Sequence, residues 1–423
     1  MVARRKLIVS SPNQYKYGYP RVSLYALMLA AAGIPLYIHL PRFASVELGI
    51  GLAALGSLLL ALRVIDLVQD PLIGWAIDRF PKAQNFFALS AASGLAIGFP
   101  LLFSVTGQGG MLRLTVVLIL LFSAYSLGMI LLYARSATLA KTPTTPDLMR
   151  LAAWREGGML TGVILAAMLP ALLVGMGAAG EGYGAFGWAL GGVAVVAAVI
   201  SYPIWQRPVI KGEKPSLQGL AQAGALKLLL LALVNSLPVA ITSTLFLFFV
   251  EDRLMLAGQA GPLLVLFFLS AGLSVPLWTR LANRVGGRQA LLIAMPLAIG
   301  SFVGAAFLAP GQMAGFAVIC LASGAALGAD MVILPALFSV SLANAGLNAA
   351  LAFGVWSFAG KLALALAAFF VLPLLQAAGF QPGQPNAPEP LTMLTIAYAV
   401  VPCVLKLFAL ALVLTLPTKE AVA

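Results

Sequence analysis

Long apolar stretches recur along the whole chain, and short polar stretches separate them. A helix rises about 1.5 Å per residue, so roughly 18 to 20 apolar residues are enough to cross the hydrocarbon of a bilayer. Twelve stretches reach that length, at residues 20–41, 50–77, 85–106, 112–138, 151–175, 184–205, 223–250, 258–280, 288–309, 313–340, 348–378 and 390–416. The pattern predicts an all-α integral membrane protein with twelve transmembrane helices.

Composition agrees with this pattern. Of the 423 residues, 61% are apolar and only 9% are charged, which excludes an ordinary soluble globular domain. A formal net charge of +12 would favour a nucleic-acid partner in a soluble protein. Here most arginines and lysines fall in alternate loops, and the other loops carry only Arg42, Arg113 and Arg253. By the positive-inside rule, both termini are expected to be cytoplasmic, and no nucleic-acid partner is expected.

The N-terminal sequence MVARRKLIVS is followed by an apolar stretch that runs to about Leu40. A cleaved signal peptide has an apolar core of only about 7 to 15 residues, so this stretch is expected to remain as the first helix. Cys320 and Cys403 both lie in apolar stretches, and His39 is the only histidine. These residues form no disulfide framework, metal-ligand spacing or acid–histidine pair, so neither a cofactor nor an enzymatic activity is expected.

A polar stretch near the middle, QRPVIKGEKPSLQG, predicts a cytoplasmic linker between two halves of the chain. We place the N-terminal half at residues 1–206, the linker at 207–222 and the C-terminal half at 223–423. Residues separated by 205 positions also correspond between the halves: Pro71 with Pro276, Asp78 with Asn283, and Arg79 with Arg284. Two parallel six-helix repeats predict the pseudo-symmetric major facilitator fold, with the substrate site between the halves.

Three ionisable residues lie in the second apolar stretch, within LRVIDLVQDPLIGWAIDR. Arg63, Asp66 and Asp70 are spaced to occupy one face of a helix. A charge at bilayer depth costs about 2.5 to 3.5 kcal/mol on insertion scales, so such residues usually face the bundle interior and find partners. The shared fold does not require these charges, because the corresponding residues of the C-terminal half are Phe268, Ala271 and Val275.

Lys361, near the middle of the eleventh stretch, is the expected partner of the two aspartates. With Arg63 and Lys361 positive and both aspartates ionised, the formal charge of this group is zero. Two carboxylates about one turn apart and shielded from water resist ionising together, so Asp66 and Asp70 are predicted to bind a proton or Na⁺. The alternative is a buried salt-bridge network that only joins the helices.

The end of the same stretch, GWAIDRFPK, predicts a gate. Gly74 permits close helix packing, whereas Asp78 and Arg79 fall at the expected water boundary. Asp78 is an acid in a basic loop, and Arg284 repeats the position of Arg79, so these four residues are candidates for the gate. The alternative is an ordinary cytoplasmic anchor of the positive-inside type.

Further polar residues lie at bilayer depth and are candidates for contact with a solute or cation. Arg155 lies a turn or more inside the fifth helix, where it either reaches the central cavity or extends its charge to the interface. Asp330 is a lone acid in the tenth stretch, and Trp356 lies near Lys361. Lys406 in the twelfth stretch is expected to extend to the cytoplasmic interface. In the fourth stretch the candidate oxygen ligands are Ser126 for the cation and Tyr133 for the solute.

The series R-x-x-D-x-x-x-D-P-x-x-G-x-x-x-D-R at residues 63–79 resembles the glycoside-pentoside-hexuronide cation symporter family of the major facilitator superfamily. The segments PDLMRLAAWRE and FGVWSFAGKLALAL resemble the same family. The resemblance implies that Asp66 and Asp70 bind the coupling cation and that Lys361 couples cation and substrate occupancy. It also implies that Arg155 contacts substrate and that the Asp-Arg pair ending the series belongs to the cytoplasmic gate.

Sugar-binding members of that family carry an aspartate in helix 1 and another in helix 4, and here both stretches lack an acid. We expect a secondary active transporter that couples H⁺ or Na⁺ to symport of a small organic solute, such as a sugar or glycoside, by alternating access. The alternatives are a transporter of lysolipid or another amphipathic lipid, and a non-transporting sensor. The expected location is the bacterial inner membrane, as a monomer whose partners are the solute and the lipid bilayer.

Overall fold

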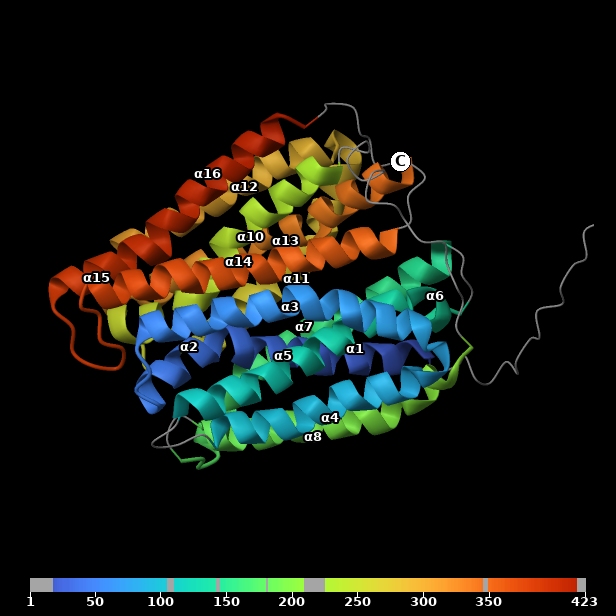
Figure 1. Ribbon diagram of the computed structural model, residues 1–423. Coiled ribbons are helices and arrows are strands. Elements are labelled where there is room, and N and C mark those ends of the chain that lie inside the picture. Colours follow the sequence, from blue (N-terminus) through green and yellow to red (C-terminus); the bar gives the residue numbers. More distant parts are fainter. Residues whose placement is uncertain are drawn as a thin grey trace, which may run out of the picture.

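The computed structural model describes residues 18–104, 110–141, 145–179, 182–208, 225–344 and 349–416. Within these ranges the chain has twelve helices long and apolar enough to cross a membrane, and it has no β-strand. Each of the twelve overlaps one predicted stretch, which confirms the all-α prediction. Figure 1 shows the helices running side by side along a common direction.

Six long helices of the first part of the chain are α1 (Gly18–Ile34), α3 (Leu52–Arg79), α4 (Gln84–Phe103), α5 (Gly110–Ala134), α7 (Thr145–Gly175) and α8 (Tyr183–Ser201). Two short helices accompany them, α2 (Leu40–Arg42) and α6 (Ser136–Leu139). The second part contains α10 (Ala225–Phe248), α11 (Ala260–Val285), α12 (Gly287–Val303), α13 (Met313–Asn344), α14 (Ala349–Ala377), α15 (Pro388–Thr395) and α16 (Val401–Leu414).

The first membrane span is longer than predicted. After α1 it continues through a π-helical segment at Pro35–His39, through α2, and through a second π-helical segment at Phe43–Glu47. Pro35 and Pro41 do not end the span, because each lies in the first turn of a new helical segment, where no backbone N–H donor is needed. As a consequence Arg42, which the sequence placed in an external loop, lies inside a helical span.

The helices pack as two groups. In the first, α1 packs along α7, and α4 packs along α5 and α8. In the second, α13 packs along α11 and α12, and α10 packs along α14 and α16. The groups meet where α14 lies beside α3 and where α11 lies beside α7 (Figure 1). The predicted linker at 207–222 falls almost entirely outside the described residues, so the division of the chain at those positions stays a prediction.

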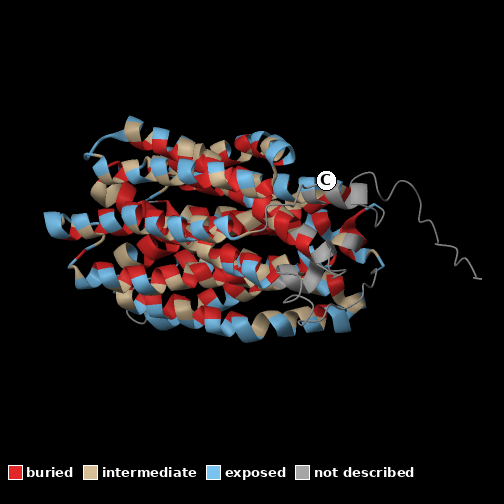
Figure 2. Cartoon of the chain, turned by 90° about the horizontal axis from the view of Figure 1, so that it is seen from above, coloured by how far each residue is buried: buried red, intermediate tan, exposed pale blue. Residues whose placement is uncertain are grey.

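Glycines permit the closest helix contacts. A Cβ at Gly162 of α7 would lie 2.2 Å from the carbonyl oxygen of Leu27 in α1, and a Cβ at Gly324 of α13 would lie 2.2 Å from that of Phe267 in α11. In a membrane, packing rather than exclusion of water drives helix association, and small residues let backbones approach. Figure 2 shows the resulting pattern, with buried residues between the helices and exposed residues on their outer faces.

The two ends of the bundle differ in what they contain. Both described chain ends lie at one of them, which we call the terminal end (Figure 1). There Arg207 donates to the carbonyl oxygen of Leu139 at 2.8 Å, and Arg288 donates to that of Leu414 at 2.8 Å. We call the other end, where the first span finishes at Glu47, the opposite end. A cytoplasmic location for the terminal end stays a prediction.

Candidate functional site

A lysine of α14 joins the two groups of helices inside the bundle. The Lys361 ammonium donates to Asp70 Oδ2 of α3 at 2.5 Å and to Ser126 Oγ of α5 at 2.7 Å. Lys361 and Ser126 are buried, whereas the Asp70 side chain keeps 18% of its surface exposed. The pairing of Lys361 with an aspartate of the second span, which the sequence predicted, is therefore observed for Asp70. We call these three residues the Lys361 joint.

A second ion pair lies one turn away on the same helix. Arg63 Nη1 and Asp66 Oδ2 are 2.5 Å apart, and both side chains are almost completely buried. The Arg63 guanidinium also lies over the ring of Phe122 in α5, with Cζ 4.0 Å from the ring centroid, a favourable cation–π contact. The stripe predicted on one face of α3 thus faces α5 and α14, and its formal charge together with Lys361 is zero.

One carboxylate oxygen of the Lys361 joint, Oδ1 of Asp70, accepts no hydrogen bond from the described residues. This oxygen atom is buried. An ionised carboxylate accepts several hydrogen bonds or ligates a cation, so this oxygen can take a proton or a monovalent cation while Oδ2 still faces Lys361. Among the described residues, no group of three or more histidine, cysteine, aspartate or glutamate side chains is placed to hold a metal ion.

Arg155 and Tyr133, two predicted solute contacts, lie against each other. The Arg155 guanidinium of α7 stacks over the Tyr133 ring of α5, with Cζ 4.0 Å from the centroid. Its Nε and Nη2 each lie 3.0 Å from Glu156 Oε1, and the Glu156 side chain is 53% exposed. The Tyr133 hydroxyl contacts the sulfur of Met159 at 3.9 Å. This stacked pair presents an aromatic ring and a forked donor side by side, a combination suited to hydroxylated or anionic groups.

The other two predicted solute contacts belong to the second group of helices. Asp330 of α13 forms a buried ion pair with Lys406 of α16. Trp356 of α14 packs against Phe338 of α13, with ring centroids 4.9 Å apart. The expectation that Lys406 extends to the cytoplasmic interface is wrong, because its side chain is only 7% exposed and finds an acid inside the bundle. Charge complementarity with the lone Asp330 was the sequence signal for this pair.

The predicted gate residues lie toward the terminal end. Asp78 Oδ1 is 3.4 Å from Nη1 of Arg135, which also donates to the carbonyl oxygen of Ile77. Burial lowers the pKa of the Arg135 guanidinium, and the Asp78 carboxylate partly offsets this effect. Asp78 therefore has its partner in its own group, at the residue between α5 and α6, which the sequence did not predict. The remaining gate candidates are Arg79 and Arg284, which are exposed, and Gly74, which has open space where a Cβ would point.

At the opposite end, an arginine of the first group forms ion pairs with two acids of the second. Arg42 Nη2 lies 2.5 Å from Glu251 Oε2, and Nη1 lies 3.2 Å from Asp252 Oδ2. Asp252 Oδ1 also accepts from the backbone N–H of Gly383 at 3.0 Å. The Arg42 and Asp252 side chains are 8% and 6% exposed. Nothing in the spacing of the sequence pairs these residues, although two adjacent acids at the end of an apolar span were a signal that they need a cation.

A further hydrogen bond joins the two groups at the same end. The backbone N–H of Ala53 in α3 donates to Gln376 Oε1 of α14 at 2.9 Å. A Cβ at Gly56 would lie 2.7 Å from the carbonyl oxygen of Ala368, so α3 and α14 are in close backbone contact here. The hydrogen bonds and ion pairs given above that join the two groups lie at the Lys361 joint and at the opposite end.

Comparisons with known proteins agree with this architecture. The family described as MFS/sugar transport protein matches residues 17–420. The crystal structure of the nucleoside transporter NupG has a TM-score of 0.69 at 14% identity, covering 95% of this chain and 100% of that one. A bacterial homologue of the human lysosomal transporter Spinster, inward-facing and occupied, has a TM-score of 0.68 at 15% identity, covering 96% and 97%. No curated protein sequence matches the chain significantly. At these identities the structures show a shared fold.

Proposed function

Because the chain belongs to the MFS/sugar transport protein family, we propose that it is a secondary transporter that couples a cation to symport of a small organic solute. It is a multi-pass integral membrane protein and a transporter rather than an enzyme. Beyond family membership, we propose that the coupling cation is H⁺ or Na⁺, and we propose a class of solute and a binding site for the cation and for the solute. It also places the protein in a bacterial inner membrane as a monomer with cytoplasmic termini.

The Lys361 joint is the observation that carries the proposal. Lys361 belongs to one group of helices, whereas Asp70 and Ser126 belong to the other, so this contact must break or rearrange if the groups rock against each other. An ion pair shielded from water is strong only while both partners are charged. Neutralising Asp70 with a proton, or sharing its charge with Na⁺, therefore weakens the hold on Lys361.

The ion pair of Arg63 and Asp66 balances the charge beside the proposed cation site at Asp70. The Asp66 carboxylate lies one turn from Asp70 and is paired with Arg63 at 2.5 Å. The two carboxylates and the two basic side chains, Arg63 and Lys361, have no net charge together. The coupling ion therefore binds most readily at the carboxylate oxygen that accepts no hydrogen bond, Asp70 Oδ1. The released Lys361 ammonium then becomes available to order the solute site. This linkage makes cation and solute occupancy favour each other.

The closed opposite end supports alternating access from an inward-facing arrangement. Arg42, Glu251 and Asp252 hold the two groups together there, whereas three of the predicted gate residues at the terminal end are exposed, namely Asp78, Arg79 and Arg284. Tyr133, beside Arg155, is 38% exposed, which suits a solute that arrives from or leaves to the terminal end. Opening to the other side requires the contacts of Arg42 to separate.

A hydroxylated solute fits the stacked pair best. Sugars, glycosides and nucleosides offer hydroxyl oxygens to the forked Arg155 donors and a flat apolar face to the Tyr133 ring. The nucleoside transporter among the similar structures belongs to the same chemical range. A second candidate, an amphipathic lipid, is favoured by the absence of any acid in α1 and α5 and by the thioether of Met159 beside Tyr133.

Thermal unfolding of the purified protein tests the class of solute and the coupling ion together. A panel of sugars, glucuronides, nucleosides and lysolipids is measured with and without Na⁺ and at two pH values. A ligand that binds the folded state at 100 times its Kd stabilises it by about 2.7 kcal/mol, a readily measured shift. We expect stabilisation by a hydroxylated solute, larger when the coupling ion is present. Stabilisation by lysolipids alone would instead support the lipid candidate.

Replacing Arg42 with alanine should open the opposite end. The change removes two ion pairs and leaves the carboxylates of Glu251 and Asp252 without the Arg42 guanidinium. We expect labelling of a cysteine introduced at Val46, which packs against Gly383, to accelerate roughly fivefold or more, because partly buried pairs contribute more than the ~0–1 kcal/mol of exposed ones. A membrane-impermeant maleimide provides the measurement.

The matched control for this change is Arg113→Ala, which removes an exposed arginine elsewhere in the first group of helices. It should leave the labelling rate at Val46→Cys unchanged. Equal rates in the Arg42→Ala variant and the control would show that Arg42 does not hold the opposite end closed.

A further inference from the structure

A second polar cluster lies within the second group of helices and takes no part in the Lys361 joint. Lys406 of α16 donates to Asp330 Oδ2 of α13 and, at 2.6 Å, to Asn235 Oδ1 of α10. The three residues are 5% to 8% exposed. We call them the Lys406 cluster. Because it connects helices of one group only, rocking of the groups does not require it to break.

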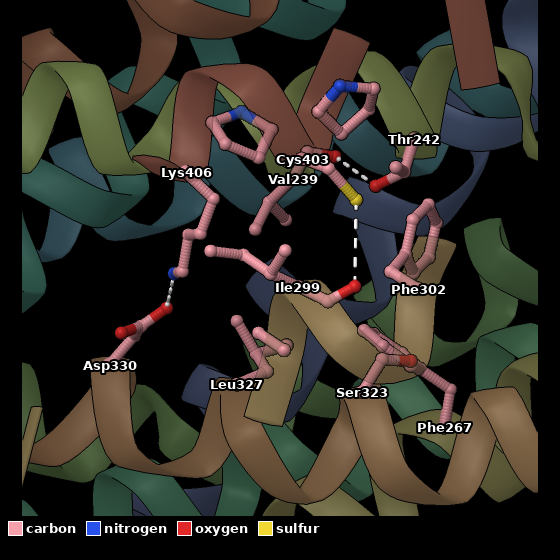
Figure 3. A pocket seen from close by; sticks show the side chains of 13 residues that line it. Val239, Thr242, Phe267, Ile299, Phe302, Ser323, Leu327, Asp330, Cys403 and Lys406 are labelled. Carbon is pink, nitrogen blue, oxygen red and sulfur yellow. Dashed lines mark hydrogen bonds and ion pairs between the residues drawn. The ribbon is translucent and has the colours of Figure 1, made fainter. Parts of the chain in front are cut away.

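The Lys406 cluster borders a cavity. The cavity has a volume of about 70 Å³, and its walls come from α10, α11, α12, α13 and α16. Figure 3 shows Asp330 and Lys406 facing each other at one end, with Val239, Ile299 and Leu327 beside them. Thr242, Ser323 and Cys403 also line it, and each donates to a backbone carbonyl of the protein. The cavity is therefore mainly apolar with one charged end.

The charged end has one open donor and one open acceptor. An ammonium group has three N–H donors, and Lys406 uses two of them among the described residues. Asp330 Oδ1 is buried without a donor in the described part of the chain. Because the charges of Asp330 and Lys406 cancel, a charged ligand would leave a net charge at bilayer depth, which is costly. A hydroxyl group is neutral and both donates and accepts, so it satisfies this end.

We propose that this cavity is a second ligand site, separate from the transport site, for a small neutral hydroxylated molecule with an apolar body. Its hydroxyl group lies at Asp330 and Lys406, and its hydrocarbon packs against Val239, Ile299 and Leu327. A ligand of this chemistry comes either from water, as a small alcohol, or from the bilayer, as a hydroxyl-headed lipid. The site does not depend on the proposed solute or coupling ion.

Two constitutional isomers test the proposal directly. n-Butanol and diethyl ether contain the same atoms, but only the alcohol donates a hydrogen bond. Cys403 lines the cavity, and in a Cys320→Ala variant it is the only thiol of the chain, so its modification by methyl methanethiosulfonate reports occupancy. We expect n-butanol to slow this modification roughly two- to tenfold more than diethyl ether at equal concentration, the range expected for one net hydrogen bond.

A paired substitution tests the residues. In the Asp330→Leu/Lys406→Met variant, which removes both charges together, the difference between the isomers should disappear. The midpoint of thermal unfolding gives a second readout, in which the wild-type protein should unfold at a higher temperature in n-butanol than in diethyl ether. This difference in unfolding midpoint tests for binding of the alcohol even if Cys403 is unreactive or the double variant does not fold. Equal protection of Cys403 by the two isomers, together with equal unfolding midpoints in the wild-type protein, would overturn the proposal.

The source of the ligand is tested in nanodiscs with and without a monoacylglycerol. Protection of Cys403 by the monoacylglycerol assigns a ligand from the bilayer, whereas protection by n-butanol alone assigns one from water; both support the site. Protection by neither compound, with equal unfolding midpoints, means that the cavity holds only water and contradicts the proposal.

Discussion

An Asp70→Asn variant should lose all accumulation of solute against its gradient while still exchanging solute downhill. The amide keeps the shape of the side chain and an oxygen for Lys361 but carries no charge that a cation can neutralise. The contact between Lys361 and residue 70 then no longer depends on cation binding, so an imposed ion gradient cannot drive accumulation of the solute. Gradient-driven uptake and solute counterflow in proteoliposomes measure the two activities separately.

Asp66→Asn should have the same effect on accumulation, because it leaves Arg63 without its carboxylate partner two turns from Asp70. The matched control is Glu389→Gln, an exposed acid of α15, which should accumulate solute as the unchanged protein does. Wild-type accumulation by both aspartate variants would mean that the coupling cation binds elsewhere.

Replacing Lys361 with methionine should both destabilise and uncouple the protein. Removing one partner of a buried ion pair typically costs about 3 to 5 kcal/mol, because the other charge stays behind without compensation. Asp70 and the Ser126 hydroxyl lose their shared donor in this variant. We therefore expect a lower midpoint of thermal unfolding together with loss of gradient-driven uptake.

Adding Asp70→Asn to this variant separates stability from coupling. The double variant has no unpaired carboxylate at this position, so most of the lost stability should return, whereas accumulation should not. Lys82→Met, which removes an exposed lysine at the terminal end, is the control for loss of positive charge. Recovery of accumulation along with stability would assign Lys361 a purely structural role.

The twelve spans were predictable because crossing a bilayer requires long apolar segments, and that requirement is local in sequence. The face of α3 that carries Arg63, Asp66 and Asp70 was predictable for the same reason, since helical periodicity fixes which residues share a face. The partnership with Lys361 followed from charge complementarity alone. The choice of Asp70 rather than Asp66 as its direct partner did not, because it depends on the relative depth of α3 and α14.

Contacts that depend on helix packing were not predictable. Lys406 and Asp330 are 76 residues apart, and Arg42 and Asp252 are 210 residues apart, so no spacing rule relates them. Arg42 was also misplaced because the first stretch was predicted to end at residue 41, whereas π-helical segments and α2 continue the span to Glu47. Likewise, the partner of Asp78 is Arg135, which only the packing of α3 against α5 brings near.

If cation binding at Asp66 and Asp70 is linked to solute binding through Lys361, each ligand must raise the affinity for the other, and both affinities can be measured. The affinity for solute is measured with and without saturating coupling ion, and the affinity for the ion with and without saturating solute. Linkage requires the same factor in both directions, and allosteric coupling of this kind is typically about 5- to 150-fold. We expect equal factors in this range for the unchanged protein, falling to about 1 in the Asp70→Asn variant. Affinities that do not respond to each other in the unchanged protein would contradict this linkage.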